Sequence, residues 1–282
     1  LESRLLDYVN LIRYISSRGH QVFVADLELH VPIVQSNDEL RSGSAIRKLL
    51  TKYNNILYNM ADASNVYIIP YSALVLRHGS GFSNKFWHLA RAPFSHQFMA
   101  KYSSKIIGTV LSVFGLTARA LVLDLDNTLW GGVIGDDGLD GIKLGGDFPG
   151  NVFVQLQRLF TQLSTDGIPL TLCSKNTEKI AMNAINNHPE MIITVNDVVS
   201  KRINWESKSK NILELAEELN LGTASLCFID DNPVERSEVR LGVSKIYVPE
   251  LPNDIVDWYD FICDLPELTR HTVTQADKGR TD

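Results

Sequence analysis

The stretch that decides the fold is Ala120-Leu-Val-Leu-Asp-Leu-Asp-Asn-Thr128. Its apolar start predicts a buried strand over residues 120–125, because parallel strands that are covered on both faces are nearly continuous apolar runs. Asp124 and Asp126 stand where this strand ends, and Thr128 follows directly. In doubly wound sheets, ligands bind beyond the carboxyl ends of the strands. The stretch therefore predicts a site that two carboxylates and a hydroxyl group share.

Further apolar runs alternate with helical patterns downstream of this stretch. Strands are predicted at residues 169–173, 192–195, 225–229 and 245–248. Helices are predicted between them, at residues 152–163, 178–187, 207–219 and 233–241. This alternation predicts that residues 117–282 form one α/β domain built on a doubly wound parallel sheet.

The region before this domain, residues 1–116, shows the same alternation on a smaller scale. Strands are predicted at residues 21–26 and 66–69, and helices at residues 2–17, 40–60 and 93–114. We expect a smaller α/β layer, with the last helix leading into the second domain. The chain begins without Met, so we also expect it to be part of a longer protein.

The composition describes an ordinary globular protein of 282 residues with a net charge of −6. An acidic chain is a poor match for a phosphate backbone, and no apolar run reaches the length of a membrane helix. We therefore expect neither a nucleic-acid nor a membrane partner. The cysteines are three in number and lack Cys-x-x-Cys spacing, which favours a reducing, cytoplasmic compartment over a disulfide framework or a zinc site.

A second acidic pair, Asp230 and Asp231, closes the strand predicted at residues 225–229. The carboxyl ends of parallel strands meet at one edge of a sheet, so this pair is expected to join Asp124 and Asp126. Four carboxylates in one place repel one another unless they hold a proton or a hard cation. The sequence therefore predicts a Mg²⁺ site with these four residues as ligands.

A carboxylate beside Mg²⁺ can attack a phosphoryl group and form an aspartyl-phosphate, while a second carboxylate moves the proton. We assign these two roles to Asp124 and Asp126. Thr128, Ser174 and Lys208 are expected to bind the phosphoryl oxygens and to neutralise the transferred group. Each of these residues alone is more often a helix cap or a solvated surface group, and it is their order along the chain that favours chemistry.

With these motifs in place, the sequence resembles the haloacid dehalogenase superfamily, and more narrowly its FkbH-like branch. The resemblance is carried by the runs at residues 122–138, 172–176, 204–212 and 228–233, and upstream by residues 86–95. It implies a HAD-like doubly wound sheet preceded by a smaller, truncated SGNH-hydrolase-like α/β domain. The upstream layer shows neither a Gly-Asp-Ser opening nor an Asp-x-x-His pair, so we expect no hydrolase activity there.

The resemblance also implies an activity. Such an enzyme takes a three-carbon acyl unit from 1,3-bisphosphoglycerate or a related phospho-acyl donor, removes phosphate, and loads the unit onto the phosphopantetheine thiol of an acyl carrier protein in polyketide biosynthesis. Cys173 matches the thiol that would carry the acyl group. Because side chains alternate faces along a strand, Cys173 can instead be a buried apolar residue if Ser174 faces the phosphate.

The lengths between the motifs leave no room for an inserted cap domain. Residues 131–150 suffice only for a glycine-rich flap, so we expect an open, capless site suited to a carrier-bound arm. Two rival hypotheses remain. One is a Mg²⁺-dependent phosphatase acting on another phosphorylated substrate, and the other is a noncatalytic docking module of a synthase.

Overall fold

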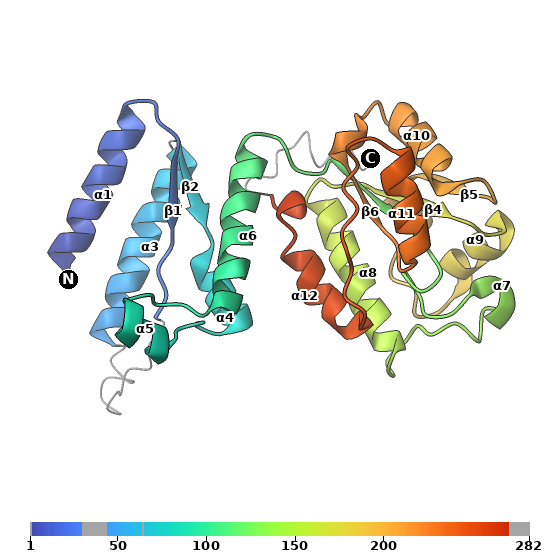
Figure 1. Ribbon diagram of the computed structural model, residues 1–282, viewed down its shortest axis with the longest axis horizontal. Coiled ribbons are helices and arrows are strands. Elements are labelled where there is room, and N and C mark those ends of the chain that lie inside the picture. The colour runs from blue at the N-terminus through green and yellow to red at the C-terminus, as the bar shows by residue number, and fades with distance from the viewer. Residues whose placement is uncertain (1, 30–43, 64, 271–282) are drawn as a thin grey trace. The chain divides into compact units, whose positions relative to one another are not determined.

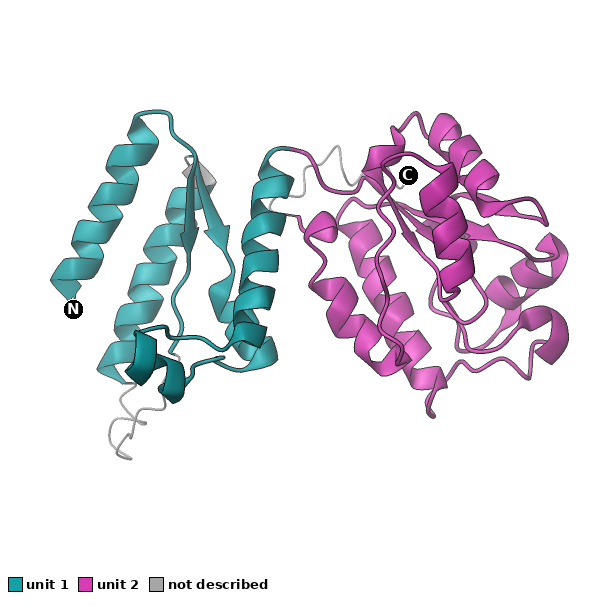
Figure 2. Cartoon of the chain, viewed as in Figure 1, with its two compact units in different colours: residues 1–114 teal, residues 115–282 magenta. Residues whose placement is uncertain are grey.

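The computed structural model describes residues 2–29, 44–63 and 65–270 (Figure 1). The chain divides into two compact units, Leu1–Phe114 and Gly115–Asp282 (Figure 2). The boundary expected from the sequence lay between residues 116 and 117. The two units are described separately below.

The first unit is a small α/β layer. Its strands, β1 (Val22–Ala25) and β2 (Val66–Ile69), pair in parallel with Val22 opposite Val66. Its helices are α1 (Glu2–Ser17), α3 (Ala45–Ala63), α4 (Tyr71–His78), α5 (Asn84–Ala90) and α6 (His96–Val113). Residues 40–43, where the sequence predicted the start of α3, lie outside the described residues.

Two apolar clusters hold the first unit together. Val9 and Ile12 of α1 pack with Tyr53 and Leu57 of α3 against Val24 of β1. On α4 and α6, Tyr71, Leu74 and Phe98 form the second cluster. Both strands are thus covered by helices, as short parallel strands require.

The second unit contains a four-stranded parallel sheet in the order β5-β4-β3-β6. Its strands are β3 (Ala120–Leu123), β4 (Leu170–Ser174), β5 (Val198–Ile203) and β6 (Leu226–Ile229). Its helices are α7 (Ile134–Asp137), α8 (Gly150–Thr165), α9 (Glu178–Asn187), α10 (Lys208–Glu218), α11 (Pro233–Gly242) and α12 (Trp258–Cys263). The sheet order places the first strand in the middle, so the expected doubly wound parallel sheet is confirmed.

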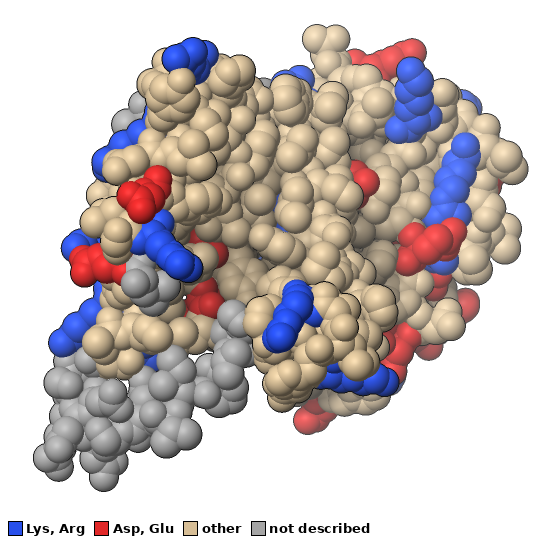
Figure 3. All heavy atoms as spheres, turned by 60° about the vertical axis from the view of Figure 1, so that its left-hand side comes forward, with Lys and Arg blue, Asp and Glu red and all other residues tan. Residues whose placement is uncertain are grey.

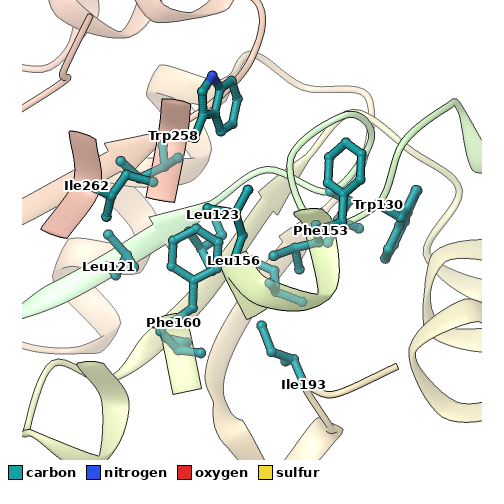
Figure 4. Close-up of a cluster of buried hydrophobic side chains, with 14 of the residues drawn as sticks. Leu121, Leu123, Trp130, Phe153, Leu156, Phe160, Ile193, Trp258 and Ile262 are labelled. Carbon is teal, nitrogen blue, oxygen red and sulfur yellow. The ribbon is translucent and has the colours of Figure 1, made fainter. Parts of the chain in front are cut away.

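The sheet of the second unit buries both of its faces. Leu121 and Leu123 of β3 point into a large apolar cluster with α8 and α12, which Figure 4 shows. Ala120 and Val122 point into a second cluster with α10 and α11. This alternation is the period of two that a strand imposes, and it explains why β3 is apolar at every position.

The prediction of a strand at residues 192–195 is wrong. The backbone N–H groups of Ile192 and Ile193 donate to Oε1 of Gln157, at 2.9 and 3.1 Å, instead of to a neighbouring strand. The edge strand is β5, which begins at Val198 and pairs with β4. Its Ser-Lys-Arg centre hides it from a search for apolar runs, because an edge strand keeps part of its surface in solvent.

The strand predicted at residues 245–248 is reduced to a single parallel bridge between Tyr247 and Cys227. Tyr247 still donates to the carbonyl of Leu226 and accepts from the N–H of Phe228, so this segment covers the free edge of β6. Among the described residues, no helix combines the length and the apolar character needed to cross a membrane. On the face drawn in Figure 3, basic and acidic residues are interspersed and form no continuous basic patch.

Candidate active site

The predicted site residues arrive on the ends of different strands. Asp124 follows β3, Ser174 ends β4, and Asp230 follows β6. Lys208 is the first residue of α10, the helix that comes after β5. Because the sheet is parallel throughout, these ends lie at one edge, as the sequence predicted.

The carboxylates of Asp124, Asp230 and Asp231 form a group whose ligand oxygens lie within 4.8 Å of one another. Asp230 is fully buried and Asp124 nearly so. Thr128, in the segment after β3, contacts the segment after β6, because its Oγ1 accepts from the N–H of Asp231 at 3.2 Å. Carboxylate oxygens in such a cluster are the donor set that Mg²⁺ prefers, so these three residues fit a divalent cation.

Lys208 is the cation within this acidic group. Its Nζ lies 2.9 Å from Oδ1 of Asp124 and 2.5 Å from Oδ2 of Asp230, and the residue is 3% exposed. Burial by itself would lower the pKa of Lys208, but the two carboxylates outweigh it and raise the pKa above its ordinary value. The ammonium group is therefore held between the carboxylates of Asp124 and Asp230.

Asp230 and Asp231 both have raised pKa values. Burial, followed by the charge of Asp124, raises the pKa of Asp230 to about 7, against the opposing effect of Lys208. The same two causes raise the pKa of Asp231 to about 6. Three carboxylates facing one ammonium leave excess negative charge in a poorly solvated place, which a bound divalent cation would offset.

Asp126 is not a member of this three-carboxylate group, although the sequence analysis counted it among the ligands. Its Oδ1 accepts from Nε1 of Trp130 and from the N–H of Ile134, each at 2.9 Å. Its Oδ2 accepts from Nδ2 of Asn176, also at 2.9 Å. These donors hold the carboxylate beside the segment that follows β3, and burial raises its pKa. Trp130 and Asn176 had no predicted role, and only their place in the quoted motif runs pointed to them.

Ser174 and Cys173 face different sides of β4. Cys173 is fully buried in the cluster under α10 and α11, with its Sγ 3.8 Å from the carbonyl oxygen of Lys208. Burial raises the pKa of this thiol far above its ordinary value, so the thiolate is disfavoured. The structure therefore brings Ser174 to the site edge and places Cys173 in the apolar layer behind it.

The segment between β3 and α8, here called the flap, contacts Asp126 through the N–H of Ile134. Gly131 and Lys143 pair in antiparallel fashion, and the short helix α7 lies between them. Residues 115–270 are all described, and this run contains no additional domain between the motifs. A pocket of about 510 Å³ lies beside the flap, and Asp231 is one of the residues that line it.

Comparisons with known proteins place this geometry in a family. No family model matches the chain, and no curated protein matches it. The N-terminal part of the protein BF1531 from Bacteroides fragilis, which contains a phosphatase domain and was solved with Mg, is similar at a TM-score of 0.83. The two are 30% identical over 96% of this chain and 73% of that chain.

A second solved structure is the HAD family enzyme bt-2542 from Bacteroides thetaiotaomicron. It is 15% identical, with a TM-score of 0.36 over 52% of this chain and 98% of that chain. So distant a likeness carries no argument, and the assignment rests on the first comparison. The chain belongs to the family of the BF1531 phosphatase domain.

Proposed function

We propose that this protein is a Mg²⁺-dependent phosphatase that acts through Asp124. The observation that carries the proposal is the convergence of Asp124, Asp230 and Asp231 with the buried Lys208 at one edge of the sheet. The related domain of BF1531 is a phosphatase domain in complex with Mg, which supports the same cation here. Burying several carboxylates together without a ligand is energetically unfavourable, so we expect this cluster to belong to a functional site.

Each residue has a role in the proposed reaction. Asp124, Asp230 and Asp231 would hold Mg²⁺, which supplies positive charge to the phosphoryl oxygens. A carboxylate oxygen of Asp124 attacks phosphorus, the bond to the leaving oxygen breaks, and an aspartyl-phosphate forms. Lys208 neutralises charge on the transferred group, and Asp126 gives its proton to the leaving oxygen. Water then attacks the phosphorus of the aspartyl-phosphate and gives its proton back to Asp126, which releases phosphate and restores both Asp124 and Asp126.

The test is phosphate release from small phosphomonoesters, measured with Mg²⁺ and with a chelator. Asp124→Asn should abolish release because the amide is a poor nucleophile, whereas Asp166→Asn should not. Asp166 is the matched control, since it follows α8 at the opposite edge of the sheet and accepts from Gln162 at the helix end. Release that persists in Asp124→Asn or in the chelator would refute the proposal.

We propose a narrower activity within this chemistry, the loading of a three-carbon acyl unit from 1,3-bisphosphoglycerate or a related donor onto an acyl carrier protein. The motif runs and the capless site support it, because an open site admits a carrier-bound arm. Intact-mass measurement after incubation with the donor, Mg²⁺ and carrier protein tests it. Phosphate release without any acyl adduct on the carrier would remove the transferase step and leave the phosphatase.

A further inference from the structure

The pocket beside the flap is lined by one residue of the carboxylate group and is far larger than a phosphate ion. It measures about 510 Å³, and Asp231, one of the three clustered carboxylates, forms part of its wall. Apolar walls come from Phe153, Leu251 and Trp258. A molecule whose phosphate lies at Asp231 would therefore have its organic part in contact with these side chains.

Lys143 contributes a positive charge to the wall of this pocket. Its side chain is exposed and has no hydrogen bond or ion pair in the described part of the chain. The pocket's other cation is already engaged: the guanidinium of Arg236 donates to the carbonyl oxygens of Asp230 and Asp231 and pairs with Glu250. An approaching acidic group would meet Lys143 as an unpaired cation.

The backbone of Lys143 is held firmly against the segment that follows Asp126. Its N–H donates to the carbonyl of Gly131 at 2.7 Å, and its carbonyl accepts from the N–H of Gly131 at 3.0 Å. A Cβ on Gly131 would come within 2.8 Å of the Phe153 ring and 3.1 Å of Cβ of Lys143. Glycine at this position thus lets the lysine, the apolar wall and the active-site segment approach one another closely.

We propose that this pocket binds the organic part of the phosphorylated substrate, and that Lys143 pairs with a second acidic group on it. The proposal rests on the proposed phosphatase function and narrows its substrates to small phosphorylated acids. These carry a carboxylate or a second phosphate a few bonds from the phosphate that is removed. Charge complementarity supports this class. Asp231, one of the clustered carboxylates, and the cationic Lys143 both line the pocket. A leaving group with an acidic group would be attracted to Lys143, whereas a cationic or neutral one would gain nothing from it.

The kinetic test uses two phosphomonoesters that differ in one terminal group, 3-phosphooxypropanoate with a carboxylate and propyl phosphate with a methyl group. The measured quantity is the ratio of their kcat/KM values in the Mg²⁺-loaded protein. Lys143→Ala should lower this ratio by up to about fivefold, the range for an exposed charge pair. Lys143→Arg should preserve the preference, and Lys143→Glu should reverse it. The control is Lys245→Glu, because Lys245 is exposed near the start of β6, at the opposite edge of the sheet.

A binding test keeps this inference separate from the phosphatase proposal. Titration calorimetry with Mg²⁺ compares 4-phosphonobutanoate with butylphosphonate, neither of which can be hydrolysed. If no phosphate is released from either ester, the phosphatase proposal fails. A carboxylate preference in binding that Lys143→Ala removes would still support the pocket. If phosphate is released but the ratio is the same in wild type, Lys143→Ala and Lys245→Glu, the pocket assignment is overturned and the phosphatase stands. The pocket assignment is also overturned if the wild-type protein shows no preference for the carboxylate ligand in binding.

Discussion

Replacing Lys208 by Met should destabilise the metal-free protein by about 3–5 kcal/mol, because it removes one partner of a buried charge group. Lys208 lies 2.9 Å from Asp124 and 2.5 Å from Asp230, and the three side chains are at most 7% exposed. At an effective dielectric constant of about 20, the attraction across such a distance is about 6 kcal/mol, and part of it is offset by desolvation. Met nearly keeps the length of the side chain and its packing near the ring of Phe228. The loss of stability therefore measures the effect of removing the positive charge.

The assay is urea unfolding in a chelator near neutral pH, followed by the same measurement with Mg²⁺. The control variant is Lys210→Met, two positions along the same helix, where an exposed lysine pairs with Glu206 at 3.2 Å. That change should cost at most about 0.5 kcal/mol. Mg²⁺ should stabilise Lys208→Met more than wild type, since the three carboxylates then lack their internal cation. Equal stability of the two variants in the chelator would refute the electrostatic account of the site.

Three further outcomes follow from the same structure. Cys173→Ala should retain phosphate release, and native protein should resist alkylation at Cys173, because the thiol is fully buried; a large loss of turnover would show that the thiol takes part. Gly131→Ala should cost about 1–3 kcal/mol in unfolding experiments, because the new Cβ meets the Phe153 ring at 2.8 Å, and a second change, Phe153→Leu, should recover part of the loss. The metal-free protein should lose thermal stability between about pH 4 and pH 7, because the pKa values of Asp231 and Asp230 rise from 3.8 to about 6 and about 7 on folding. A raised carboxyl pKa gives stability that is complete below the unfolded value and is lost as pH rises through the folded one, so an unfolding temperature that rises over this interval in a chelator would contradict it.

Much of the site could be predicted because it depends on local pattern and one topological rule. Apolar runs at residues 120–125 and 225–229 predicted two strands, which pair with each other in the sheet, and the acids at their ends were expected to meet. Parallel strands bring their carboxyl ends to the same edge, so residues about a hundred positions apart become neighbours without any specific contact between them having to be known. Asp124, Asp230, Asp231 and Lys208 were brought together for this reason.

Other features were settled by contacts that a linear pattern does not contain. The edge strand was misplaced because the side chain of Gln157, 35 residues earlier in the chain, takes the N–H groups of Ile192 and Ile193. The carboxylate of Asp126 is held apart from the clustered acids by donors from Trp130, Ile134 and Asn176, a set that no spacing rule specifies.

By itself, the sequence determined the fold class and the edge of the sheet at which the acids and Lys208 stand, because hydrophobic periodicity and strand direction are local properties that survive in any packing. Only the tertiary structure decided which carboxylates converge, which face Cys173 occupies, and that Lys143 stands unpaired beside a pocket. Side-chain direction and pocket shape arise from close packing between distant segments, where each contact depends on all of its neighbours.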